Sequence, residues 1–74
     1  MTMTETYQDQ FLHELKKDRV MSTFFLMNGY QMRGIVVGYD HFVVVLLSDG
    51  KQAMIYKHAI STISPYHPLK AMQG

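Results

Sequence analysis

Residues 20–39 read VMSTFFLMNGYQMRGIVVGY, and this stretch decides the fold. Two runs rich in β-branched and aromatic residues flank Asn28-Gly29, a dipeptide that strongly favours a β-hairpin turn. Gly34 and Gly38 interrupt the second run, and isolated glycines inside a strand often mark bulges or sharp bends. We therefore expect two antiparallel strands, the second of them bent, at Val20–Met27 and Tyr30–Tyr39.

The flanking residues predict one helix and three further strands. Residues 5–17 form an amphipathic helix, with Thr6 placed to cap it and an apolar stripe of Tyr7, Phe11, Leu12 and Leu15. Downstream, turn sequences at Asp40-His41, Ser48–Lys51 and Lys57-His58 separate three strands at Phe42–Leu47, Gln52–Tyr56 and Ala59–Ser64. A helix before five short strands indicates a mostly β, strongly bent five-stranded small barrel. We expect the domain to span residues 5–64, between flexible segments at 1–4 and 65–74.

The composition favours an oligomer. The chain has 74 residues, 47% of them apolar, a net charge of +1 and no cysteine. A core of this size is only marginally sufficient, and no disulfide can support it. The first predicted strand is apolar on both faces, with Val20, Phe24 and Leu26 on one and Met21, Phe25 and Met27 on the other. One face fills the core, so the other must meet a partner, a ligand or water.

Neither catalysis nor membrane insertion has a signature in the sequence. The four histidines lack metal-ligand spacing, and we find no P-loop, no Gly-x-Ser-x-Gly and no cysteine nucleophile. We therefore expect no enzymatic activity, no cofactor and no metal. The longest apolar run, residues 42–47, is far too short to span a membrane, and the N-terminus lacks the features of a secretion signal. The expected location is the cytoplasm.

Several motifs together resemble the bacterial Hfq family. Residues 56–62, YKHAIST, look like its signature. Residues 39–42, YDHF, together with Asn28-Gly29 and Gly34, resemble its second Sm-type motif, and QDQFL at 8–12 resembles its N-terminal helix. The resemblance, over residues 7–65, implies an Sm-like (SH3-like) barrel that forms a homohexameric ring by pairing edge strands. It also implies an RNA chaperone that anneals small regulatory RNA to mRNA in post-transcriptional regulation and the stress response.

One set of candidate residues would bind U-rich RNA at the pore. Taken alone, Lys57-His58 is an ordinary exposed turn, and Phe42 is an ordinary core residue at the start of a strand. In a ring, six copies of Lys57 would surround one axis and attract single-stranded RNA. The resemblance implies that Lys57 contacts uracil, His58 contacts ribose or phosphate, and Phe42 stacks on a base. The proximal set is Gln8, His41, Phe42, Tyr56, Lys57 and His58, whereas Asp40 is expected to hold its turn or a subunit contact.

Two further sets follow from the same resemblance. A-rich RNA is expected on the opposite, distal face, at residues that would otherwise be ordinary barrel or interface positions: Phe25, Gly29, Tyr30, Gln31, Met32 and Thr62. A basic rim of Lys16, Lys17 and Arg19 is expected to hold RNA laterally, although lysine lacks the planar fork of the arginines that many members carry. Ala53 replaces a distal glutamine of many members, and its neighbour Gln52 points to the other face, so we expect weaker adenine selectivity.

Other binding modules remain as alternatives. An SH3-like peptide-binding module would use tryptophan beside its aromatic groove, and the chain has no tryptophan. A structural oligomeric module would need only the two-faced strand. An OB-fold would also bind single strands, but it would not place its only helix before all five strands. The family resemblance favours the RNA-binding ring over these classes.

Overall fold

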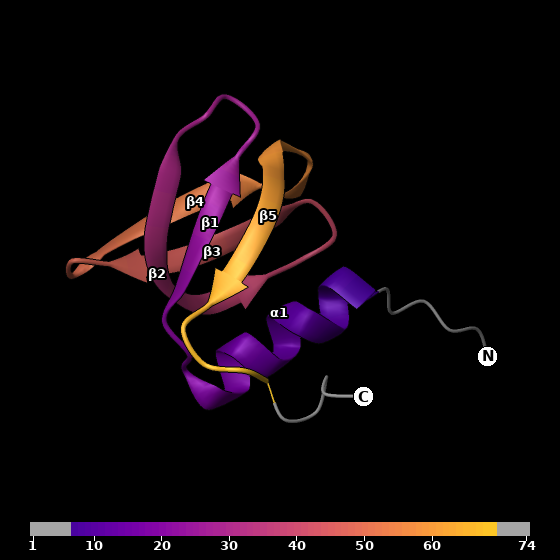
Figure 1. The fold of residues 1–74 in the computed structure, drawn as a ribbon, viewed down its shortest axis with the longest axis vertical. Coiled ribbons are helices and arrows are strands. Elements are labelled where there is room, and N and C mark those ends of the chain that lie inside the picture. The colour runs from indigo at the N-terminus through magenta and orange to yellow at the C-terminus, as the bar shows by residue number, and fades with distance from the viewer. Residues whose placement is uncertain (1–6, 70–74) are drawn as a thin grey trace.

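The computed structural model describes residues 7–69, and within them one helix precedes five antiparallel strands (Figure 1). The strands form a single bent sheet in the order β4-β3-β2-β1-β5. The long strand β2 pairs with β1 at its beginning and with β3 at its end, so it belongs to both halves of the sheet. The elements are α1 (Tyr7–Asp18), β1 (Ser22–Leu26), β2 (Gln31–Tyr39), β3 (Val43–Ser48), β4 (Lys51–Tyr56), the 3-10 helix η1 (Lys57–Ala59) and β5 (Ile60–Pro65). This confirms the predicted fold class.

The first strand is shorter than the sequence indicates. The backbone N–H of Val20 donates to the carbonyl oxygen of Leu15 at 3.1 Å, so Val20 closes the end of α1 instead of opening β1. Arg19, between them, takes a left-handed conformation with φ 52°. At the other end Met27 enters the turn, where its N–H donates to the carbonyl oxygen of Ala59. Glu5 and Thr6, the expected start of the helix, lie outside the described residues.

The chain stays packed beyond the position where the sequence places the start of a tail. Pro65 belongs to β5, and the backbone N–H of Tyr66 donates to the carbonyl oxygen of Met21 at 3.0 Å. Leu69 is only 5% exposed and joins the core. Residues 65–69 are therefore part of the domain surface and core, and the remainder of the expected tail, residues 70–74, lies outside the described residues.

Two tight turns set the register of the sheet. Asp49 and Gly50 both have positive φ, 53° and 75°, as a two-residue hairpin between β3 and β4 requires. In the β1–β2 turn Gly29 has φ 93° and donates its N–H to Leu26, while the side-chain oxygen of Asn28 accepts from Tyr30 at 3.0 Å. The predicted Asn28-Gly29 turn is thus explained by a side-chain contact and by a backbone conformation that glycine adopts without strain.

The sheet bends where β2 leaves β1 and joins β3. A Cβ atom at Gly34 would lie 2.8 Å from the carbonyl oxygen of Leu47, so only glycine lets these backbones approach. The β2–β3 register then shifts between Val36 and Gly38, which marks a bulge. Both glycines were predicted as bend or bulge positions, and the structure gives each a distinct cause: close backbone approach at Gly34 and a register shift beside Gly38.

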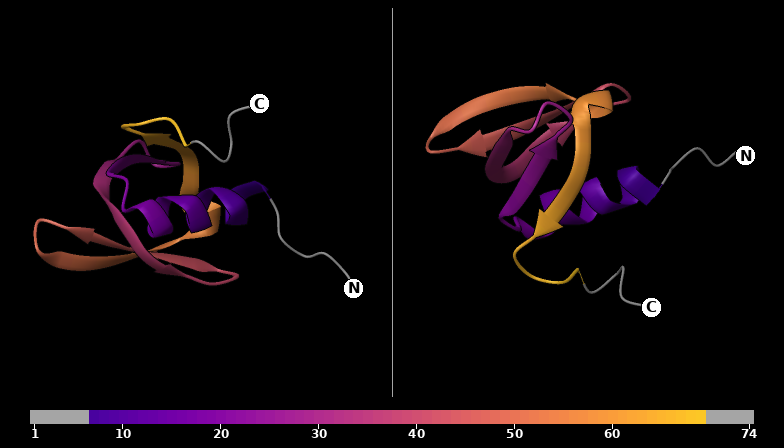
Figure 2. Two further views of the ribbon diagram at one scale, coloured as in Figure 1. Left: turned by 90° about the horizontal axis from the view of Figure 1, so that it is seen from below. Right: turned by 45° about the horizontal axis from the view of Figure 1, so that its top comes forward.

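The core lies inside the bend and beneath α1. Its completely buried side chains include Phe24 of β1 and Leu12 and Leu15 of α1. The helix packs against β2 and crosses one open end of the bent sheet (Figure 2). The prediction that Tyr7 belongs to the buried apolar stripe of α1 is wrong, because its side chain is 83% exposed. It is the first residue of α1, whose N-terminal end projects past the sheet in Figure 1.

Both outer strands, β4 and β5, leave an edge unpaired within the chain. Strand β1 is two-faced, as expected: Phe24 is buried, whereas Met21 just before the strand and Met27 just after it are exposed. On β4, the side chains of Met54 and Tyr56 are also exposed. Residues 7–69 contain no helix long and apolar enough to cross a membrane, and no cluster of side chains in this part of the chain could hold a metal ion.

Candidate nucleic-acid interface

The turn between β2 and β3 is built to present Phe42. The side-chain oxygen Oδ1 of Asp40 accepts hydrogen bonds from the backbone N–H groups of Phe42, at 2.8 Å, and Val43, at 2.9 Å. These two bonds lower the pKa of the Asp40 carboxyl below its ordinary value of 3.8. In this turn the Phe42 side chain is 72% exposed. Its ring lies edge-on to the ring of His41, with the two ring centroids 6.2 Å apart. Asp40 therefore holds its turn, as the sequence indicates, and Phe42 is available for stacking.

Lys57 reaches the same turn from the end of β4, the strand paired with β3. Its backbone N–H donates to the carbonyl oxygen of Phe42 at 2.8 Å, which joins η1 to the β2–β3 turn. The side chain is only 11% exposed: Nζ lies 2.6 Å from Oδ1 of Asp9 on α1 and 5.5 Å from the centre of the Tyr39 ring. In this chain, therefore, the positive charge of Lys57 is accompanied by the carboxylate of Asp9.

Tyr56 and His58 complete this cluster. Their rings are stacked, with centroids 5.3 Å apart and planes inclined by 14°. Both side chains are exposed, so the stacked pair offers a flat aromatic surface beside Lys57. Gln8 is separate within one chain. It lines a groove of about 290 Å³ between the start of α1 and β5, with Phe11 and residues 60–63.

Part of the expected distal set lies on the face of β1, β2 and β5 that points away from the core. Phe25 is opposite Gln31 on one side and opposite Thr62 on the other, so three predicted residues form one row across three strands. Gly29 and Tyr30 are at the adjoining hairpin, where Tyr30 is exposed. Met32 is the exception, since it is opposite the buried Phe24 and packs against the core.

The expected rim residues lie at the end of α1. Lys17 forms an ion pair with Glu14 one turn earlier, at 3.2 Å. Lys16 and Arg19 instead line a small groove of about 180 Å³ against residues 35–37 of β2. Lys16 and Arg19 therefore line the same groove, whereas the ammonium of Lys17 is paired with the carboxylate of Glu14.

A family model confirms the resemblance that these motifs indicate. The model described as "Hfq protein" matches residues 7–70, which include the helix, the five strands and all three sets of site residues. The chain belongs to the Hfq family.

Relatives and solved structures agree with this assignment to the Hfq family. The "RNA-binding protein Hfq" of Desulforamulus reducens is 56% identical over 62 residues, covering 84% of this chain and 78% of the relative. The protein of the same name from Clostridium botulinum is 56% identical over 67 residues, covering 90% and 79%. A crystal structure of "the pleiotropic translational regulator, Hfq" matches with a TM-score of 0.77 and 47% identity, over 80% of this chain and 98% of that one. The prediction of a nucleic-acid-binding protein rather than an enzyme agrees with this family.

Sequence reasoning missed the surroundings of Lys57 in this Hfq-family chain. Asp9 and Lys57 are 48 positions apart, and neither residue's neighbours indicate the other. Tyr39 was seen only as part of a motif, not as the ring beneath the lysine ammonium. The one usable signal was Asp9 itself, an acidic residue near the start of a helix that must lie across the end of the barrel. Asp9 has a simpler interpretation, however, as an acidic residue that stabilises the positive end of the helix dipole.

Proposed function

We propose that this chain is a subunit of a cytoplasmic homohexameric RNA chaperone that holds U-rich small RNA on its proximal face and A-rich RNA on its distal face, and so promotes annealing of small RNA to mRNA. The observation that carries the proposal is the pairing of exposed Phe42 with Lys57 through the Asp40 turn. An exposed aromatic ring on a turn that is hydrogen-bonded to the backbone of a lysine is a suitable site for single-stranded RNA, because a base can stack on the ring and the lysine can attract phosphate. The names of the relatives, RNA-binding proteins, support the same function.

The ring is supported by the two free edges. Strands β4 and β5 lie at opposite ends of the sheet order, so β4 of one subunit can pair with β5 of the next in a head-to-tail contact. Met54, exposed on β4, would gain apolar cover in such a contact. A closed ring leaves no free edge and adds the burial that this small core lacks.

The two RNA faces would act together in annealing. The Phe42 cluster lies at the β2–β3 turn, whereas the row of Phe25, Gln31 and Thr62 lies on the outward face of the other half of the sheet. Two RNAs bound to one ring experience a raised effective concentration, and basic side chains offset part of their mutual repulsion. Lys16 and Arg19, on a common groove at the rim, are the residues proposed to guide the strands together.

Native mass measurement with and without a uridine hexanucleotide tests the ring and its ligand together. Six copies of the 8.6 kDa chain give about 52 kDa, and one bound oligonucleotide adds its own mass. Lys57→Ala and Phe42→Ala should each weaken binding while the 52 kDa species persists. A monomer at micromolar concentration would refute the ring, and uridine binding indifferent to both substitutions would refute the proximal site.

A further inference from the structure

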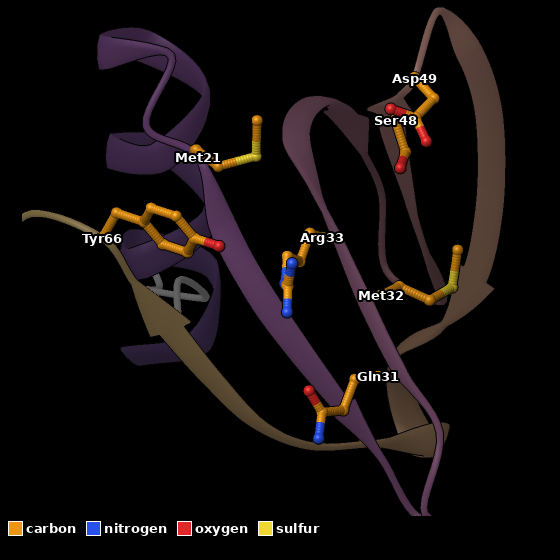
Figure 3. Close-up of a pocket in the computed structure, with 7 residues that line it drawn as sticks. All are labelled: Met21, Gln31, Met32, Arg33, Ser48, Asp49 and Tyr66. Atoms are coloured by element: carbon orange, nitrogen blue, oxygen red, sulfur yellow. The ribbon is translucent and has the colours of Figure 1, made fainter.

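The outside of the sheet carries a groove beside each half of β2. The wider one, at the start of the strand, is lined by Gln31 and Arg33 among others (Figure 3) and belongs with the distal set described above. The smaller one, of about 180 Å³, lies against residues 35–37 and is lined on its other side by Lys16 and Arg19. These two cations belong to the proposed rim, whereas no function proposed above uses the apolar side of the groove.

The apolar side of the smaller groove is aliphatic and faces away from the core. Ile35 precedes the buried Val36, so its side chain points outward, and its cross-strand neighbour on β3 is Leu47, which is 37% exposed. The register shift between Val36 and Gly38 leaves Val37 without a partner on β3. Such a bulge re-aims a side chain, and that of Val37 is 36% exposed. Ile35, Val37 and Leu47 therefore form an aliphatic strip on the outside of the sheet.

The proposed ring contact leaves this aliphatic strip uncovered. That contact joins the free edge of β4 to the free edge of β5, whereas the strip lies on β2 and β3. In the sheet order β2 is two strands from β4, which corresponds to about 10 Å at the usual spacing of neighbouring strands. The groove and the strip are complete within one chain, so they do not need the ring.

The groove suits an aliphatic side chain better than a base. Its lining consists of two cations and three aliphatic residues, without an aromatic ring, an amide or a hydroxyl side chain. Arg19 could bind a phosphate, but Ile35 and Val37 offer a base neither a stacking ring nor a hydrogen bond from their side chains. An aliphatic side chain would bury apolar surface against them. The volume is below the range of about 300–1,000 Å³ usual for small molecules, so it fits one side chain of a larger partner.

The two cations favour an acidic partner. Neither Lys16 nor Arg19 forms an ion pair with another residue of the range 7–69, and no acidic residue of that range lines the groove. The adjacent Lys17, by contrast, is paired with Glu14. Residues 66–74 contain no acidic side chain, so this segment does not supply the complementary charge. A carboxylate of another protein would meet two unshared positive charges next to an apolar surface.

We propose that the groove of Lys16 and Arg19, together with the aliphatic strip, is a docking surface for an acidic segment of another protein. An aliphatic side chain of that segment packs on the strip, and its carboxylates pair with the two cations. This inference goes beyond the proposed RNA chaperone function. A docked partner occupies the rim cations and so slows the annealing of two RNAs, but it leaves the proximal and distal faces open, because neither includes the strip.

A fluorescein-labelled peptide of sequence EDLIDE tests the docking surface by fluorescence anisotropy at low salt. It should bind more tightly than EDGGDE, which lacks the aliphatic side chains, and more tightly than QNLINQ, which lacks the acidic ones. Val37→Thr and Leu47→Gln should each weaken its binding by roughly 3- to 30-fold. Lys16→Gln and Arg19→Asn should each weaken it by roughly 2- to 5-fold, an effect that fades as salt rises. Asparagine is chosen because it readily adopts the left-handed φ of 52° found at Arg19.

Matched controls lie outside the groove and the strip. Lys17→Gln removes a cation from the same end of α1, and Met27→Gln removes an exposed apolar side chain from the β1–β2 turn. Both should leave the affinity for EDLIDE nearly unchanged. Val37→Ile keeps the apolar surface and should retain binding, which separates loss of the strip from loss of the fold.

RNA measurements separate this inference from the proposed function. Val37→Thr and Leu47→Gln should leave the affinity for U-rich and A-rich RNA unchanged, and saturating EDLIDE should slow annealing by wild type. Binding of EDGGDE as tight as that of EDLIDE, or EDLIDE binding indifferent to both substitutions, would overturn the docking surface alone. Weaker RNA binding by the two variants would assign the strip to RNA, and loss of the wild-type native mass would assign it to the ring. Failure of wild type to bind either RNA would overturn the proposed function and leave the peptide result standing.

Discussion

Nζ of Lys57 lies 2.6 Å from Oδ1 of Asp9, in a pair whose side chains are only 11% and 17% exposed. The cation proposed to attract RNA is therefore offset by a carboxylate before RNA arrives. Since water screens this pair poorly, RNA must either share the lysine with Asp9 or displace it. The pair also ties α1 to η1, so one contact affects both the stability of the domain and the charge of the proposed proximal site.

Asp9→Asn should tighten binding of U-rich RNA. The substitution keeps the shape of the side chain but removes a negative charge, so Lys57 becomes available to phosphate. The slope of log affinity against log salt should become steeper by about 0.7 for each lysine newly engaged, as measured by fluorescence anisotropy at several salt concentrations. The melting temperature should fall, because removing one partner of a partly buried pair costs about 1–3 kcal/mol.

Glu14→Gln is the matched control for Asp9→Asn. It removes another acidic side chain of α1, but one that pairs with the exposed Lys17 instead of Lys57. Its effect on the affinity for U-rich RNA should be small. If Asp9→Asn instead weakens binding as Lys57→Ala does, Asp9 orients the lysine for RNA and does not compete with it.

Phe42→Ala should weaken the binding of U-rich RNA without destabilising the domain. A base stacked on an aromatic ring contributes about 1–3 kcal/mol, so the loss should be roughly 5- to 150-fold in affinity. Because the side chain is 72% exposed, the urea midpoint should barely change. Phe42→Leu restores apolar bulk without a ring, and full recovery of affinity by leucine would contradict a stacking role.

The carboxyl group of Asp40 should make the stability of the folded domain depend on pH in the acidic range. Hydrogen bonds from Phe42 and Val43 to the ionised carboxyl lower its pKa in the folded state, so its contribution is present above the ordinary value of 3.8 and lost as pH falls through the lowered one. Asp40→Asn keeps an acceptor oxygen but no charge. Wild type should melt higher than Asp40→Asn at neutral pH, and the difference should shrink below about pH 4. A difference that is constant from neutral pH to about pH 2.5 would exclude this charge effect.

The parts of the fold that the sequence predicted are those with local causes. Asn28-Gly29 makes its own turn through a hydrogen bond from the Tyr30 N–H to the Asn28 side chain, and Asp49-Gly50 makes the β3–β4 turn with two residues of positive φ. The end of the first strand differs from the prediction because of a tertiary contact: the N–H of Met27 donates to the carbonyl oxygen of Ala59, so Met27 belongs to the turn.

The site was predictable only where a motif carried it. The YKHAIST and YDHF motifs located Lys57 and Phe42, but no local pattern indicates that Asp9 would reach across 48 positions to the lysine. The place of Tyr66 was missed for a similar reason. Tyr66 lies past Pro65, where the sequence predicts the start of a flexible tail, and only its backbone hydrogen bond to Met21 holds it against the sheet.

The register of β4 bears on the expected adenine selectivity of the distal face. Ala53 is opposite Leu46 and Gln52 is opposite Leu47, in a β3–β4 ladder that runs without a shift from Val43 to Ser48. The buried Leu46 shows that Ala53 faces the inner side of the sheet, whereas Gln52 faces away with the exposed Leu47. No bulge brings Gln52 to the place of Ala53, so its amide cannot substitute for a side chain at residue 53.

Because many Hfq-family members carry glutamine at the place of Ala53, Ala53→Gln should raise the preference of the distal face for adenine over guanine. Stacking on Phe25 and Tyr30 discriminates bases poorly, whereas a good bidentate contact to a base edge contributes about 1–3 kcal/mol of discrimination in DNA complexes. The expected gain is roughly 5-fold or more in a competition between oligoadenylate and its guanine-substituted versions. Gln52→Ala should leave the preference unchanged, because that side chain lies on the opposite face of β4 from residue 53. If wild type already discriminates strongly and Ala53→Gln adds nothing, adenine is selected by backbone groups or by residues other than the one at position 53.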